Sequence, residues 1–175
     1  MNYSVLKRAA ISIIAAVTVS VSGTAQQKGD MAVGANLLFG TTSGYSNIGL
    51  GPKFLYNVTD KIRLAGEFDY FLKKDYVSFW DISVYGHYLF PIAENIVVYP
   101  SVGLGILGST VKVPSYNILG ITYGGGSTSG TDFALSLGGG IDYALTPKLT
   151  LNGELRYKVV SGGWFNIAVG ISYKL

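Results

Sequence analysis

The sequence contains no cysteine, a single histidine and few charged side chains. Without cysteine no disulfide can hold the fold, so stability must come from the chain's own pairing and packing. The histidine, His87, has no clustered cysteine or carboxylate beside it, which argues against a metal site. Charged residues make up 13% of the chain, whereas soluble domains average about 25%. This composition does not fit an ordinary water-exposed surface.

Long hydrophobic runs are missing as well. After residue 25 no segment approaches the roughly 18 consecutive apolar residues that a membrane-spanning helix needs, although hydrophobic residues make up 49% of the chain. A hydrophobic chain that lacks a helical span can still cross a bilayer as a closed β-barrel.

The first residues predict a secretory signal peptide, residues 1–25. Lys7 and Arg8 precede an apolar run over residues 9–21, and small residues at Gly23 and Ala25 predict cleavage after Ala25. The alternative, a membrane anchor, needs about 20 apolar residues. The remaining residues, 26–175, form one domain by length. They keep 11 of the 13 basic residues against 10 acidic ones, a net charge of +1 that gives no support for nucleic-acid binding.

Eight later stretches alternate strictly between apolar and polar residues, the pattern of strands with two different faces. In the last stretch, Phe165, Ile167 and Val169 alternate with Asn166 and Ala168. The stretches are residues 31–39, 48–57, 62–70, 80–90, 96–106, 132–143, 149–159 and 164–175. The pattern predicts an all-β fold, an eight-stranded antiparallel up-and-down barrel.

A soluble lipocalin-like barrel alternates in the same way, so the face that points outward has to be decided. Glycines crowd the polar face, which suits the cramped lumen of a small barrel. Aromatics on the apolar face gather at the two ends of the strands, as two membrane interfaces require. One row is Phe39, Tyr70, Trp80, Phe133, Tyr157 and Phe165, and the other is Tyr56, Tyr88, Phe90, Tyr143 and Tyr173. We therefore expect lipid outside and a polar lumen inside.

The connections alternate in length. Short turns at residues 57–61, 91–95 and 144–148 lie on the side of both termini, and longer loops at residues 40–47, 72–77, 108–131 and 160–163 lie on the other. The 108–131 loop, the longest, is the candidate surface for a ligand. Within it, residues 115–123 read either as loop or as strands that extend past the membrane.

Three segments resemble the small outer-membrane β-barrel family of Gram-negative bacteria, the OmpX/Ail and OmpA-barrel type. They are YPSVGLGI (residues 99–106), LSLGGGIDY (residues 135–143) and the last strand, whose end at residues 171–175 resembles a barrel-assembly signal. The resemblance implies a location in the bacterial outer membrane with both termini in the periplasm. It also implies outer-membrane lipid, lipopolysaccharide and the barrel-assembly machinery as partners.

Charged side chains on the polar face are nearly balanced. Lys53, Arg63, Glu67, Glu154 and Arg156 are predicted to form a structural polar plug, because a narrow lumen is filled by side chains and buried charges must pair. An ion path or gate is the alternative. The same face carries Lys158, Lys174, Asp69, Asp81, Asp132 and Asp142.

Three functions remain open. The favoured one is a non-enzymatic structural, surface-interaction or adhesion role through the external loops, with no cofactor. The second is a small porin-like channel for small or apolar solutes. The third is a lipid-modifying enzyme, since some small barrels resembling this one use a histidine with a serine near the outer rim. His87 is predicted to lie low in the lumen, away from that rim, which argues against this chemistry.

Overall fold

A computed structural model describes residues 26–42, 44–118 and 121–175, so the predicted signal peptide lies outside the described residues. The described chain forms strands joined by turns, and no helix in this part of the chain is long and apolar enough to cross a membrane. The strands are β1 (Met31–Thr42), β2 (Tyr45–Asn57), β3 (Ile62–Lys74), β4 (Val77–Tyr88), β5 (Phe90–Ala93), β6 (Ile96–Ile118), β7 (Ile121–Ala144), β8 (Leu149–Val159) and β9 (Trp164–Lys174).

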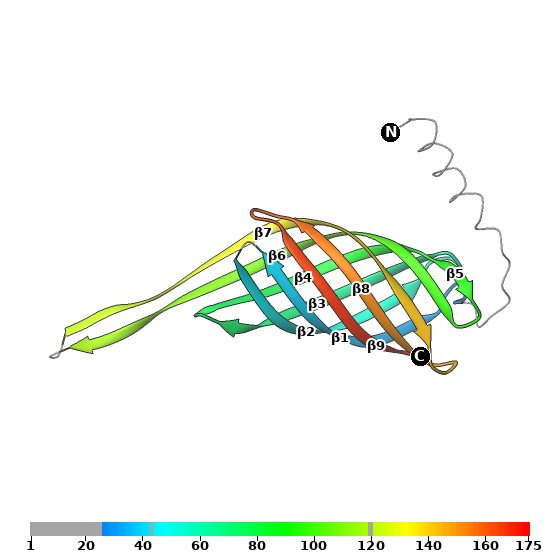
Figure 1. Cartoon of the computed structure of the whole chain (residues 1–175), viewed down its shortest axis with the longest axis horizontal. Coiled ribbons are helices and arrows are strands. Elements are labelled where there is room, and N and C mark those ends of the chain that lie inside the picture. The colour runs from blue at the N-terminus through cyan, green and yellow to red at the C-terminus, as the bar shows by residue number, and fades with distance from the viewer. Residues whose placement is uncertain (1–25, 43, 119–120) are drawn as a thin grey trace, which may run out of the picture.

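The strands close into a barrel (Figure 1). Their order in the antiparallel sheet is β4-β3-β2-β1-β9-β8-β7-β6-β5, and β4 also pairs with β6. The ladder between β4 and β6 ends at His87, and β5 resumes pairing with β6 at Phe90, so β4 and β5 act as one strand interrupted at Leu89. The barrel is therefore eight-stranded, as predicted from the alternation.

The two faces of the barrel wall have inverted polarity compared with a soluble protein. Outward-facing Leu37, Val84 and Leu155 are 63%, 56% and 54% exposed, whereas inward-facing Arg156 and Lys158 are 1% and 0% exposed. Polar and charged side chains outnumber apolar ones among the buried residues described. An apolar exterior around a polar interior is the arrangement of a transmembrane barrel.

Aromatic side chains on the outer face mark the two ends of the apolar band. Tyr70 pairs with Trp80 across β3 and β4 at one end. At the other end the rings of Tyr88 and Phe90 lie 4.8 Å apart between centroids. The aromatics of both predicted rows are exposed or partly exposed, which confirms the predicted assignment of faces.

Two strands continue far beyond the barrel. β6 and β7 have 23 and 24 residues, whereas a strand needs only about 9–11 residues to cross a bilayer. Their ladder runs from Ile96–Tyr143 to Ile118–Ile121, and the pair projects from one end of the barrel (Figure 1). The prediction of a loop over residues 108–131 is wrong, and of the two interpretations of residues 115–123 the extended strands are correct. We call this end the hairpin end and the opposite one the turn end.

Candidate functional site: the barrel interior and the projecting hairpin

An ion-pair network occupies the middle of the lumen. Arg156 of β8 reaches across to Glu67 of β3 and makes two hydrogen bonds to its carboxylate, 2.6 Å and 2.8 Å long. The same guanidinium contacts Glu154, whose other oxygen lies 3.6 Å from Nζ of Lys53 on β2. All four side chains are buried. Bidentate arginine–carboxylate pairs of this kind are the most directional ion pairs available to a protein.

A second cluster lies toward the turn end. Nη1 of Arg63 is 2.6 Å from Oδ2 of Asp142, and Nε of Arg63 donates to Nδ1 of His87 at 3.1 Å. The ring of Tyr99 stacks on His87 at 4.5 Å between centroids and also lies under the Arg63 guanidinium. His87 is thus enclosed by an arginine and an aromatic ring, buried in the lumen toward the turn end, the low position predicted for it.

Toward the hairpin end the lumen becomes apolar. Lys158 pairs with Asp81 at 2.5 Å, and beyond this pair the rings of Phe71, Phe79 and Trp164 pack edge to face. The centroid distances from Trp164 are 5.3 Å to Phe71 and 4.8 Å to Phe79. We call these rings, with their neighbours, the aromatic seal; its other members are Leu38, Leu107, Ala168 and Val160.

The aromatic seal was not predicted from the sequence, because Phe71 and Phe79 fall at the margins of the alternating stretches. The signal that could have found it is the glycine opposite two of the three rings. A Cβ added at Gly40 would lie 2.7 Å from the ring of Trp164, and one added at Gly49 would lie 2.8 Å from the ring of Phe71. Glycines on the inner face therefore mark the places where large rings cross the lumen.

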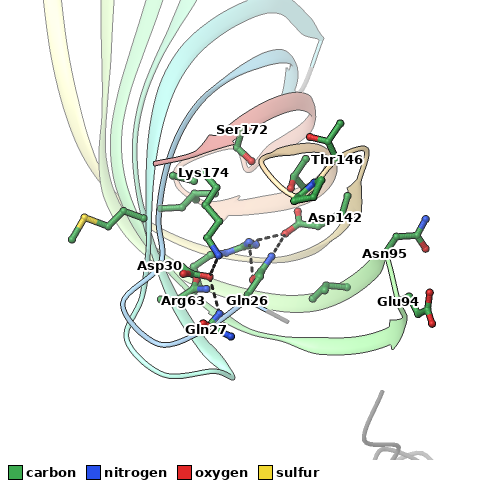
Figure 2. Close-up of a pocket in the computed structure, with 18 residues that line it drawn as sticks. Gln26, Gln27, Asp30, Arg63, Glu94, Asn95, Asp142, Thr146, Ser172 and Lys174 are labelled. Carbon is green, nitrogen blue, oxygen red and sulfur yellow. Dashed lines mark hydrogen bonds and ion pairs between the residues drawn. The ribbon is translucent and has the colours of Figure 1, made fainter. Parts of the chain in front are cut away.

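A cavity of about 770 Å³ opens at the turn end. Figure 2 shows the Arg63–Asp142 pair at this cavity, with Gln26 bonded to both side chains. Lys174 pairs with Asp30 at 2.6 Å nearby. The cavity is lined only by residues of the turn half of the barrel, so it does not extend to the aromatic seal.

Not all of the predicted lumen residues lie inside the barrel. Of the side chains predicted to face inward, most are buried inside the barrel, whereas Lys174 lies half-buried at the turn end. Asp132 is exposed, which corrects its predicted place in the lumen: the strand alternation is right, but at this height β7 has passed the closed part of the barrel. Among the described residues, no group of three or more histidine, cysteine or acidic side chains is arranged to hold a metal ion.

The projecting hairpin offers a different surface. From Gly108–Thr131 upward, β6 and β7 pair only with each other, apart from the start of β4, which reaches Val111. The side chains of residues 124–131 are all exposed. They are glycine, serine and threonine only, so the β7 side of the hairpin carries no charge up to Thr131.

A closed barrel with a charged, buried interior and an apolar exterior edged by aromatics defines a transmembrane β-barrel. The chain matches the family described as "Outer membrane protein beta-barrel domain" over residues 11–174 and belongs to it. The family places the chain in the bacterial outer membrane. A search of curated protein sequences finds no match.

Solved structures share the fold at low sequence identity. The N-terminal barrel domain of OprF from Pseudomonas aeruginosa is 16% identical with a TM-score of 0.59, covering 86% of this chain and 100% of that one. Neisserial surface protein A is 18% identical with a TM-score of 0.60, covering 83% and 96%. Ail of Yersinia pestis, in complex with the heparin analogue sucrose octasulfate, is 17% identical with a TM-score of 0.59, covering 85% and 100%.

Proposed function

We propose that the chain is a non-enzymatic surface protein whose projecting hairpin makes contacts outside the cell and whose interior is a structural plug. The observation that carries the proposal is the β6–β7 ladder, which continues from Gly108–Thr131 to Ile118–Ile121 with a single gap at Pro114 and Gly125. A paired hairpin presents a defined surface, whereas a long loop without secondary structure would have to be ordered at the moment of binding.

The contents of the lumen favour a plug over a channel. Ion pairs join opposite walls at three heights, through Arg63, Arg156 and Lys158, and the aromatic seal lies above them. A lumen of this width is filled by side chains. Purified protein in planar bilayers is therefore expected to show no steady conductance. A stable conductance on the nanosiemens scale would assign the channel function instead.

The orientation follows from the lengths of the connections. Outer-membrane barrels have short periplasmic turns and longer external segments, so the hairpin end faces outward and both termini lie in the periplasm. Outer-membrane lipid and lipopolysaccharide then surround the apolar band, and the barrel-assembly machinery inserts the chain.

The hairpin surface does not favour a polyanion like the one bound to Ail. Lys112 is the only basic residue between Gly108 and Thr131, and recognition of a sulfated sugar requires several cations. Lipid modification has no support either, because the single histidine is buried against Arg63 near the turn end. The contacts are instead expected from the main chain and small side chains of the hairpin.

The absence of cysteine allows a direct test of this topology. Ser129→Cys on the hairpin should react with a membrane-impermeant maleimide on intact cells. Thr146→Cys, on an exposed turn at the other end, should react only after lysis. Labelling of Thr146→Cys on intact cells, with Ser129→Cys protected, would invert the barrel and overturn the proposed function.

A further inference from the structure

Asp69 is a buried carboxylate without a hydrogen-bond partner among the described residues. Its side chain lies inside the barrel on β3 and is 0% exposed, and neither of its oxygens accepts a hydrogen bond from another described side chain. A buried charge without a partner has a high free energy, and a group in that position usually becomes neutral instead. The surroundings of Asp69 decide whether a neighbour compensates its charge.

The four positions around Asp69 on the inner wall of the barrel hold no basic side chain. Along β3 its neighbours on the same face are Glu67, an acid, and Phe71, a ring of the aromatic seal. On β4 it lies directly opposite Asp81. On β2 its neighbour is Gly51, where an added Cβ would lie 2.4 Å from Oδ1 of Asp69. Like charges directly opposite each other destabilise a sheet, so two ionised aspartates would repel here.

The basic side chains that face Asp69 from β8 are bound to other carboxylates. Nζ of Lys158 lies 2.5 Å from Oδ1 of Asp81. The guanidinium of Arg156 makes its bidentate contact with Glu67. Neither base is therefore free to pair with Asp69.

A count of the buried charges agrees with this local description. The described lumen holds five buried acids and four buried bases. The acids are Glu67, Asp69, Asp81, Asp142 and Glu154, and the bases are Lys53, Arg63, Arg156 and Lys158. His87 adds no positive charge, because its Nδ1 accepts a hydrogen bond from Arg63, whereas both ring nitrogens of a histidinium are donors. If all nine groups were ionised, one negative charge would remain uncompensated.

We propose that Asp69 and Asp81 hold one proton between them, so that this height of the lumen is a proton-binding site. The proton is assigned to Asp69, because Oδ1 of Asp81 already pairs with Lys158 and accepts from Oγ of Ser83 at 2.7 Å. Oδ2 of Asp81 has no hydrogen-bond partner among the described residues. Directly opposite residues have Cβ atoms roughly 5 Å apart, so the hydroxyl of a protonated Asp69 can donate to this oxygen.

The proton completes the plug. It removes the surplus negative charge and replaces the repulsion between two carboxylates with a hydrogen bond, directly below the aromatic seal. The site rests on the plug of the proposed function, because a lumen filled with water would solvate an ionised Asp69.

Infrared spectroscopy of the purified protein in phosphatidylcholine vesicles at neutral pH tests the site. A protonated carboxyl group has a carbonyl-stretch band that ionised carboxylates lack, and ordinary carboxylates are ionised at this pH. The wild type should therefore show the band of a single carboxyl group. Asp69→Asn keeps the shape of the neutral acid and should abolish the band. The matched control is Asp142→Asn, the same change in an aspartate that has its own partner, Arg63; it should leave the band in place.

Removing the neighbouring base tests the charge count. Lys158→Met leaves Asp81 without its cation, so Asp81 should also take up a proton and the band should about double. Combining Lys158→Met with Asp69→Asn should return the band to its wild-type intensity. An unchanged band in Lys158→Met would contradict the proposal.

The stability should also depend on pH in the direction that a bound proton requires. The folded protein binds one proton more than the unfolded chain, whose aspartates are ionised above about pH 5. Between that value and neutral pH, the folding constant of the wild type relative to Asp69→Asn should fall about tenfold for each unit of rising pH. Glu67, Asp81, Arg156 and Lys158, the charged groups that face Asp69, are present in both proteins, so their own titration largely cancels in this ratio.

Absence of the band from the wild type, or its survival in Asp69→Asn, would overturn the proton site. So would a wild-type stability that rises with sodium concentration while that of Asp69→Asn does not, because a metal ion would then compensate the pair. The plug itself is tested separately by conductance. A missing band without conductance leaves the plug standing, whereas a steady conductance would show a water-filled lumen and remove both.

Discussion

Strands β6 and β7 each cross two environments, and the two halves of the same ladder are built differently. In the barrel, Leu104 and Ile106 of β6 face lipid while Gly103 and Gly105 face the lumen. In the hairpin the alternation fades, and β7 becomes a run of glycine, serine and threonine. The main-chain pairing continues unchanged through the transition. Alternation is therefore imposed by lipid on one side and a closed lumen on the other, not by strand pairing itself.

The difference predicts how each half responds to substitution. A barrel residue is held by neighbouring strands on both sides and faces either lipid or a filled lumen. A hairpin residue of β7 pairs with one neighbouring strand and is otherwise exposed to water. The same chemical change should then be costly in the barrel and nearly neutral in the hairpin.

The largest difference between barrel and hairpin is expected when a basic side chain is removed. Arg156→Met leaves the buried Glu67 carboxylate without its bidentate partner, which should cost about 3–5 kcal/mol of unfolding free energy. Lys112→Met, in the exposed hairpin, should stay within about 0.5 kcal/mol. Urea titration of both variants folded into lipid vesicles measures the difference, and equal losses would show that the lumen network is not closed to water.

The second largest difference is expected when a charge is introduced on the lipid-facing side. Leu155→Arg lies in the apolar band and should cost about 2–4 kcal/mol, the range for arginine at the bilayer midplane. Val113→Arg, equally exposed but on the hairpin, should cost less than about 0.5 kcal/mol. The same titrations serve here. If Leu155→Arg left the free energy of unfolding unchanged, the apolar band would be misplaced.

A single methyl group tests the aromatic seal. Gly40→Ala forces a Cβ against the Trp164 ring and should cost about 1–3 kcal/mol. At Gly130 the nearest atom to an added Cβ is Oγ of Ser109 at 3.6 Å, an ordinary contact, so Gly130→Ala should be neutral or slightly stabilising. Tryptophan fluorescence during unfolding reports on the seal directly, and an unchanged Gly40→Ala would show that it can rearrange freely.

The smallest effect is expected from removing most of the hairpin. Replacing residues 112–127 by Asn-Gly joins the paired residues Val111 and Thr128 through a two-residue turn of the favoured kind. Heat-modifiable migration on gels should persist, with stability within about 0.5 kcal/mol of the wild type. Failure of this variant to assemble would mean that the hairpin belongs to the barrel wall.

The barrel could be predicted from the sequence because each strand has lipid on one side and the lumen on the other. This makes apolar and polar residues alternate along it. Four of the residues predicted for the polar plug, Lys53, Glu67, Glu154 and Arg156, lie in one ion-pair network in the structure. The prediction from alternation failed where the strands leave the lipid or the closed lumen. The hairpin strands have no lipid to alternate against, and Asp132 keeps its inward phase after the lumen has opened.

The Arg156–Glu67 pair also constrains how the protein is assembled. β3 and β8 are four positions apart around the eight-stranded sheet, so this pair spans the barrel and joins residues 89 apart in sequence. It cannot form while the sheet is still open, and until then Glu67 lacks its bidentate partner while Arg156 keeps only Glu154 of its own strand. A partly folded sheet therefore has a higher free energy, and the last strand pairing lowers it. Insertion should accordingly be cooperative, with the strut across the lumen completed only when the edges of the sheet meet.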